Sequence, residues 1–136
     1  MSLLVSGASE RELQQLTSVF RLLADKTRLN VLLLLASGER NVTSLCEELR
    51  LPQPTVSHHL GLLRMSSIIG NRRDGKQIFY TLHGRVNIDS GALRISVDRF
   101  SITIETARDG AGGTTISADD ISALEAIESS RDTDHP

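Results

Sequence analysis

Hydrophobic positions in the first half of the chain recur every three or four residues, the spacing of helices that bury one face. A first helix is predicted over residues 9–23, with an apolar stripe of Leu13, Leu16, Phe20 and Leu23. Ser9 and Glu12 have the spacing of a capping box at its start. Asp25 is a suitable N-cap for a second helix over about 26–36, which is apolar on nearly every side. We therefore expect the second helix at the centre of the fold.

Two further helices are predicted before residue 66. Thr43 is expected to cap a short third helix over about 44–49. Leu51-Pro52 then makes a turn, and a fourth helix runs from about 53 to 65. Prolines are tolerated in its first turn because the amides there have no partner within the helix. Its inward face is formed by Val56, Leu60 and Leu63.

After the fourth helix the pattern changes to strands. Residues 68–73 and 77–82 read as a β-hairpin, or wing, because Asp74-Gly75 between them is a strong tight-turn signal. Over about 92–106 apolar and polar residues alternate, with an interruption at Asp98-Arg99. A helical alternative places Leu93, Val97, Phe100 and Ile104 on one face, but it strands Ile95 and Ile102 on the other. We favour two strands, followed by a last short helix over about 118–129.

These elements predict a mostly α fold with a small β component. A winged helix-turn-helix domain is expected over residues 1–86, and an acidic C-terminal appendage over 87–136. The appendage would contain a β-hairpin-like segment and the short helix, and we expect it to serve dimerisation or effector binding.

Composition narrows the class of protein. With 136 residues and 39% hydrophobic residues, the chain can form one packed domain, and aromatic residues are only 3%, so the core must be built from Leu, Ile and Val. The single cysteine, Cys46, excludes an intramolecular disulfide. No apolar run approaches the roughly 18–20 residues of a membrane span, and Leu3-Leu4-Val5 is too short for a signal-peptide core. We expect a cytoplasmic protein.

The charge is unevenly distributed. Residues 1–85 carry 11 Lys or Arg against 7 Asp or Glu, and residues 86–136 carry 4 against 10, which together give the net charge of −2. Within 50–85 the balance is 6 basic residues to 1 acidic. A solvated basic face is the ordinary explanation of such a bias. Its coincidence with the fourth helix and the wing favours contact with phosphate groups instead.

The outer face of the fourth helix has the shape that a DNA-reading helix needs. Small residues there would let the helix enter the major groove, and short polar side chains near its start could reach base edges. An exposed helix face is polar by default, so this pattern alone does not decide between the two explanations. The wing adds to it, because Arg72, Arg73 and Lys76 flank its tip and could contact the DNA backbone or the minor groove.

Three ordered segments carry a family resemblance. Leu23-Ala-Asp-Lys-Thr-Arg-Leu-Asn-Val-Leu32, then Gln53-Pro-Thr-Val-Ser-His-His-Leu60, then Arg73-Asp-Gly-Lys-Gln-Ile-Phe-Tyr-Thr-Leu82 resemble the ArsR-type winged-helix transcriptional regulators over roughly residues 12–85. The resemblance implies a homodimeric, usually repressing, operator-binding protein of bacterial or archaeal type. It implies a structural role for Arg28. It also implies that Gln53, Thr55, Ser57 and His58 lie at the DNA groove. We add Arg64 and the wing residues Arg72, Arg73 and Lys76 as DNA-binding candidates.

Members of this family often sense metals, but this chain departs from their known sites. Thiol-based arsenic sensors carry three cysteines where this chain has Asn41, Thr43 and Cys46, and one thiol cannot supply a soft-metal site. Zinc-binding members use ligands on a C-terminal helix, where this chain has only His83 and His135 as histidines. We predict no metal and no cofactor, and the sequence does not identify an effector.

The sequence leaves one main alternative to DNA binding and disfavours a third class of function. A winged-helix module that binds protein and not DNA, with the acidic C-terminal part as its partner surface, is the main alternative. An enzyme is disfavoured, because the chain has no glycine-rich phosphate loop, no His/Glu metal motif and no nucleophile beside a base.

Overall fold

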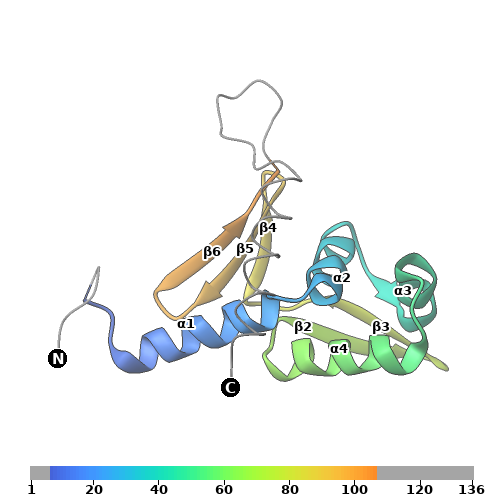
Figure 1. Cartoon of the computed structure of the whole chain (residues 1–136). Helices are drawn as coiled ribbons and strands as arrows, with labels where there is room; N and C mark the ends of the chain where they lie inside the picture. The colour runs from blue at the N-terminus through green and yellow to red at the C-terminus, as the bar shows by residue number, and fades with distance from the viewer. Residues whose placement is uncertain (1–6, 107–136) are drawn as a thin grey trace, which may run out of the picture. The chain divides into compact units, whose positions relative to one another are not determined.

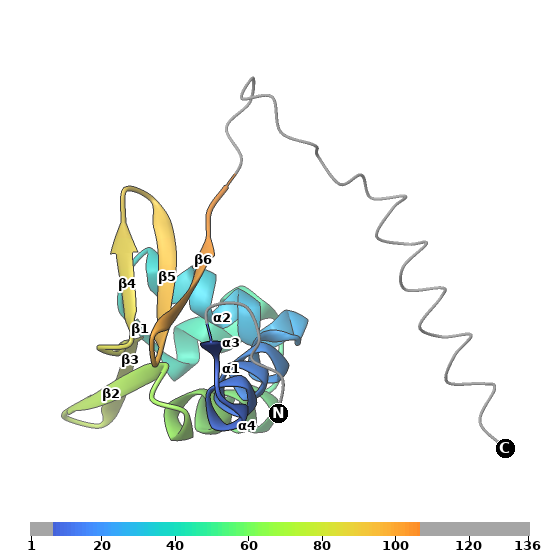
Figure 2. The same cartoon turned by 90° about the vertical axis from the view of Figure 1, so that its left-hand side faces the viewer.

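The computed structural model describes residues 7–106, which lie within one compact unit, Met1–Thr106. Its elements in chain order are α1 (Glu10–Leu23), α2 (Lys26–Ala36), β1 (Arg40–Asn41), α3 (Val42–Leu49), α4 (Gln53–Met65), β2 (Ile69–Asp74), β3 (Gln77–Leu82), β4 (Val86–Asp89), β5 (Ala92–Val97) and β6 (Phe100–Ile104). These residues form four helices and two small antiparallel sheets, and Figures 1 and 2 show how they are arranged. The helix predicted over 118–129 lies outside the described residues.

The helix caps follow the sequence with one exception. Ser9 and Glu12 form the predicted capping box, with the Ser9 hydroxyl accepting from the Glu12 amide at 3.2 Å. Asp25 caps α2, as predicted, by accepting from the amide of Arg28 at 3.0 Å. The predicted cap of α3 at Thr43 was wrong. The N-cap is Asn41, whose side-chain oxygen accepts from the Ser44 amide at 2.7 Å.

The first sheet is the wing together with a short third strand, in the order β1-β3-β2. The hairpin predicted over 68–82 is confirmed, but its two-residue turn is Gly75-Lys76, one residue later than the predicted Asp74-Gly75, because Asp74 pairs with Gln77. Gly75 has φ +64, a conformation that suits glycine in such a turn. The two-residue strand β1 pairs Arg40 with Tyr80 and Asn41 with Phe79, so the segment between α2 and α3 is joined directly to the wing.

The second sheet, β4-β5-β6, confirms strands over the predicted range 92–106 and overturns the helical alternative. The turn at Asp98-Arg99 is where the pattern broke. The strand β4, which the sequence pattern did not indicate, pairs with β5 through Val86 opposite Ile95. Register places eight apolar side chains on one face of this sheet: Val86, Ile88, Leu93, Ile95, Val97, Phe100, Ile102 and Ile104. The opposite face is mostly polar.

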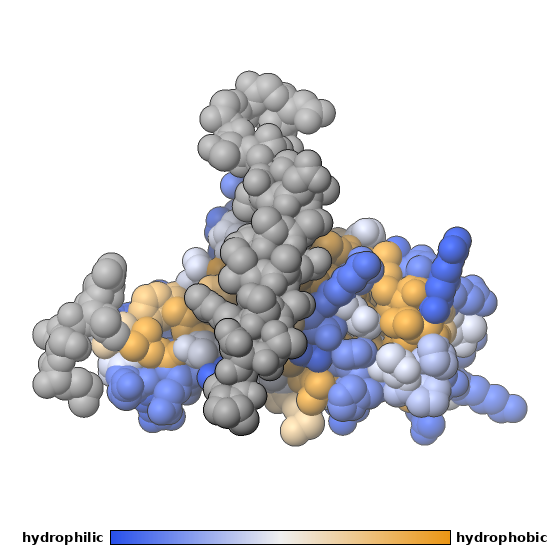
Figure 3. Space-filling view, in the orientation of Figure 1, coloured by the Kyte–Doolittle hydropathy of each residue, from blue (hydrophilic) through white to orange (hydrophobic). Residues whose placement is uncertain are grey.

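Both parts share one hydrophobic core. Side chains of β5 and of β4 belong to the same buried cluster as those of α1, α2 and α4, and Ile95 and Leu63 are fully buried in it. The apolar face of the second sheet therefore packs against the helical part. Figure 3 shows hydrophobic surface where that face ends, around the β5–β6 turn, with hydrophilic residues next to it.

Candidate nucleic-acid interface

Helix α4 is anchored by one face and exposes the other. Val56, Leu60 and Leu63 are at most 1% exposed and hold the helix against the core. Three of the predicted base-contacting residues, Gln53, Ser57 and His58, are exposed, and Thr55 is half-buried. On the same face Gly61 has nothing within 4 Å of the place where a Cβ would stand, so the surface is open there. The exposed face is polar over the first turns of the helix, whereas Met65 at its end is an exposed hydrophobic residue.

A polar cluster at the α1–α2 corner fixes the position of α4. The guanidinium of Arg28 donates to the carbonyl oxygen of Leu22 at 2.5 Å and lies 3.2 Å from Nδ1 of His59, a residue of α4. The carboxylate of Asp25 lies 3.9 Å from both the guanidinium and the imidazole. Both Arg28 and His59 are largely buried, with side chains 15% and 14% exposed. Arg28 therefore has the structural geometry expected of it, and it positions the neighbouring His58 indirectly.

The same polar cluster lowers the pKa of the Asp25 carboxyl. The backbone N–H of Arg28 donates to the carboxylate, and this bond lowers the pKa of Asp25 below its ordinary value of 3.8. The Arg28 guanidinium adds to the shift by its charge, while desolvation opposes it. The carboxylate is thus ionised at neutral pH, where it caps α2 and faces the guanidinium.

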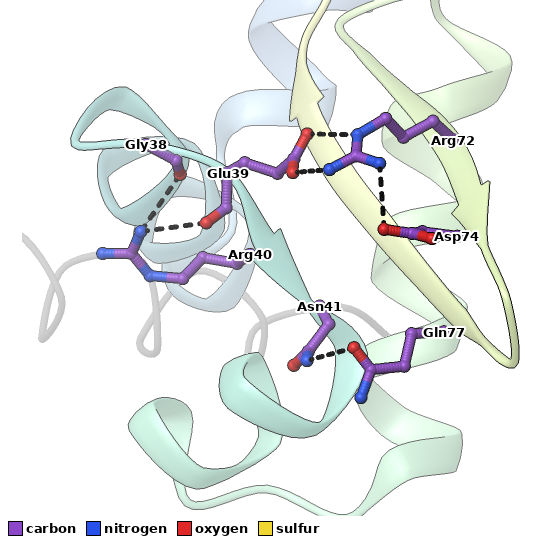
Figure 4. A network of polar contacts seen from close by, with 7 residues as sticks. All are labelled: Gly38, Glu39, Arg40, Asn41, Arg72, Asp74 and Gln77. Carbon is purple, nitrogen blue, oxygen red and sulfur yellow. Dashed lines mark hydrogen bonds and ion pairs between the residues drawn. The ribbon is translucent and has the colours of Figure 1, made fainter.

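The wing divides its basic residues between its faces. Arg72 lies opposite Phe79, on the face away from the buried Ile69, and its guanidinium stacks 4.8 Å from the centre of the Phe79 ring. It also forms a two-pronged ion pair with Glu39, one prong being Nε to Oε2 at 2.9 Å, as Figure 4 shows. Arg73 lies on the other face of the strand, opposite Ile78, and is exposed.

The ion pair shifts the pKa values of both partners in opposite directions. The hydrogen bonds from Arg72 lower the pKa of Glu39 and the same bonds raise that of Arg72. Sequence reasoning missed Glu39 because 33 residues separate it from Arg72. Figure 4 also shows the neighbouring contact between Asn41 and Gln77, 3.5 Å long, which links the start of α3 to the wing.

A groove of about 180 Å³ brings α4 and the wing together. Gln53 at the start of α4 and Lys76 at the wing tip both line it, together with Asn41 and Thr43. Two of the predicted DNA-binding residues from separate motifs thus face one space. Arg64 does not join them. It is exposed in the last turn of α4, roughly 16 Å along the helix axis from Gln53 at 1.5 Å per residue.

Within residues 7–106, no group of three or more His, Cys, Asp or Glu side chains is arranged to hold a metal ion. Cys46 is a free thiol, half-buried in α3. In the same part of the chain, no helix is long and apolar enough to cross a membrane.

Comparison with known proteins gives a consistent picture. The family model described as "Bacterial regulatory protein, arsR family" matches residues 25–69. The chain is 52% identical over 64 residues to the HTH-type transcriptional regulator KmtR of Mycobacterium tuberculosis, a match that covers 47% of this chain and 49% of that protein. It is 33% identical over 75 residues to the transcriptional repressor SdpR of Bacillus subtilis, covering 55% of this chain and 83% of the repressor. The chain thus spans about half the length of the first relative and most of the second.

A solved structure shares both the fold and part of the sequence. The solution structure of Mb0332 from Mycobacterium bovis, described as a homodimeric winged helix-turn-helix DNA-binding domain, superposes with a TM-score of 0.51 at 33% identity. The match covers 57% of this chain and 75% of that one. The winged helix-turn-helix architecture inferred from the sequence is therefore confirmed.

Proposed function

This chain belongs to the arsR family of bacterial regulatory proteins, and on that premise we propose that it is a transcriptional repressor that binds double-stranded DNA. The observation that carries the proposal is the groove that Gln53 and Lys76 share. Because both residues line it, the start of α4 and the tip of the wing lie on one surface, where both can contact the same DNA duplex. As a regulator it is not an enzyme, and with DNA as its partner it acts in the cytoplasm.

We assign the base contacts to the first two turns of α4. Gln53 can pair with an adenine edge, and Thr55, Ser57 and His58 can reach bases or adjacent phosphates. The absence of a side chain at Gly61 lets the helix approach the DNA closely. Arg64, Arg73 and Lys76 are assigned to the phosphate backbone, where they add affinity without sequence information.

Arg72 has a conditional role in this proposal. Its guanidinium is engaged by Glu39 in the free protein, so a phosphate must compete with a carboxylate for it. We therefore rank its contribution to DNA affinity below that of Arg73, which has no carboxylate within 4 Å among the described residues.

We further propose that the protein acts as a homodimer. The Mb0332 domain, to which it is similar, is described as homodimeric, and two copies of α4 would read two half-sites one helical turn apart. Sedimentation velocity tests this state directly. A monomeric mass at micromolar concentration would contradict it.

The DNA-binding proposal is tested by fluorescence anisotropy with duplex DNA over a range of salt. The wild-type protein is expected to bind nonspecific duplex with an affinity that falls steeply with salt, and to bind an inverted repeat from upstream of its own gene far more tightly. Arg73→Ala should weaken binding to every duplex and reduce the salt slope by about 1. Gln53→Ala should mainly relax base preference, by about 1–3 kcal/mol at one position.

A matched control is available on the second sheet. Arg94→Ala removes the same charge from the exposed face of β5, away from α4 and the wing, and should leave the salt slope unchanged. If the protein binds no duplex even at low salt, the proposal fails, and the alternative of a protein-binding winged helix takes its place.

A further inference from the structure

A second cavity lies at the other end of α4 from the groove, beside the first helix and the second sheet. Its volume is about 470 Å³, within the range of about 300–1,000 Å³ that small-ligand pockets occupy. It opens between α1, the residue that follows α4 and the strand β5. Val19 and Val97, both buried, contribute its apolar lining.

All the charge on this lining is positive. Its charged side chains are Arg11 of α1 and Arg85 of the link between β3 and β4, and its remaining polar groups are two glutamines and the serines Ser18 and Ser66. Among the described residues, no carboxylate lies within 4 Å of the cationic nitrogens of either arginine. A cavity with two cations, neutral donors and an apolar lining suits an anion attached to a hydrocarbon body.

Two acidic groups belong to a neighbouring groove that Arg11 also borders. In that groove Glu12 forms an ion pair with Arg99, with an Nε to Oε2 distance of 2.7 Å. The other acid there, Asp98, faces the side-chain amide of Gln15. Neither acid lines the larger cavity, so the two arginines set the sign of its charge.

Arg85 connects the cavity to the recognition helix. Its guanidinium donates to the backbone carbonyl of Ser66, the C-cap residue of α4, at 3.2 Å. That bond occupies one N–H, and the remaining donors of the fork can serve a ligand. The carbonyl of Arg85 also accepts from the amide of Ser96 in β5 at 2.8 Å. One residue therefore touches the end of α4, the second sheet and the cavity.

We propose that this cavity binds a small carboxylate with an apolar body, held by Arg11 and Arg85 over the two valines. A carboxylate held by the remaining donors of Arg85 binds the same guanidinium that donates to the Ser66 carbonyl, so occupancy is coupled to the C-terminal end of α4. Any effect of this ligand on DNA binding through α4 rests on the proposed function, but the binding of the carboxylate to the cavity does not.

The test is a ¹⁵N NMR titration of the full chain, without DNA, using benzoate as the probe. Benzoate is expected to bind in the millimolar range and to shift the amide signals of Ser18, Val19, Ser66 and Val97. Benzamide has the same shape without the charge and is expected to bind about tenfold more weakly, as the loss of a charge-assisted hydrogen bond implies.

Variants separate this site from general anion binding. Arg11→Gln and Arg85→Gln should each weaken benzoate binding about tenfold, while Arg94→Gln, on the polar face of β5, should leave it unchanged. Arg11 has no carboxylate or hydrogen-bond partner among the described residues, so its variant tests the site even if Arg85→Gln destabilises the fold. Equal affinities for benzoate and benzamide, or an affinity for benzoate that is unchanged in Arg11→Gln, would overturn the proposal. Because no DNA is present, a protein that fails to bind duplex can still pass or fail this test.

Discussion

Replacing Ile95 tests whether the second sheet and the winged helix fold as one unit. The predicted domain boundary at residue 86 falls after the first residue of β4, yet the Ile95 side chain is 0% exposed and lies in the cluster that contains Val19 and Leu63. Truncating a fully buried isoleucine to alanine costs about 2–5 kcal/mol, and Ile95→Val about 0.5–1.5 kcal/mol. Unfolding free energies of single domains are about 5–15 kcal/mol, so the larger loss is readily measured.

The assay is urea unfolding followed by two signals. The chain has one tyrosine and no tryptophan, so tyrosine emission reports Tyr80, in β3 of the wing. Far-UV circular dichroism reports mainly the helices. With a urea m-value of about 2 kcal/mol/M, Ile95→Ala should lower both midpoints together by about 1–2.5 M. Ser96→Ala, its exposed neighbour on the opposite face of β5, should change them little.

One result would refute this reasoning. If Ile95→Ala leaves the Tyr80 midpoint unchanged, the wing does not depend on the second sheet, and β4–β6 form an independent appendage. Two separated transitions in the wild-type protein would have the same meaning.

Three further outcomes are expected. Glu39→Gln should tighten nonspecific DNA binding and steepen its salt dependence, because it frees Arg72 for phosphate and removes a competing charge; weaker binding in the anisotropy assay would show that the ion pair orients the wing instead. The Arg28 amide lowers the pKa of Asp25 in the folded state, so the ionised carboxylate stabilises the fold fully above its ordinary pKa of about 4. This stabilisation is lost as the pH falls below that value. Asp25→Asn should therefore flatten the acid side of a plot of unfolding free energy against pH. Gly61→Ala should stabilise the fold by about 0.5–1 kcal/mol in thermal unfolding, since the space there is open, while DNA affinity falls if the helix must approach closely.

Local patterns predicted most of the described fold. The capping residues Ser9 and Asp25 act within four residues of their partners, so their roles were visible in the sequence. The alternation over β5 and β6 also decided between strands and a helix. A helix would have placed Ile95 outside the core, whereas the structure buries it fully.

The features that sequence reasoning missed depend on distant pairing. The strand β4 has only two apolar positions, Val86 and Ile88, and is a strand because β5 lies beside it. Asn41 and Thr43 are both good N-caps, and the pairing of Asn41 with Phe79 in the wing accompanies the earlier start of α3. For the candidate site, exposure of the α4 face followed from helical spacing. The engagement of Arg72 by Glu39 had no local signal, and the DNA contacts themselves stay predictions.

The two-residue strand β1 limits how the wing can be exchanged between proteins. Arg40 and Asn41 pair with β3, and the preceding residue, Glu39, forms an ion pair with Arg72 of β2. A hairpin transplanted as residues 68–82 alone would lose its third strand and the ion pair between Glu39 and Arg72. Chimeric regulators built from this chain should therefore carry residues 39–41 with the hairpin, treating the two pieces as a single cassette.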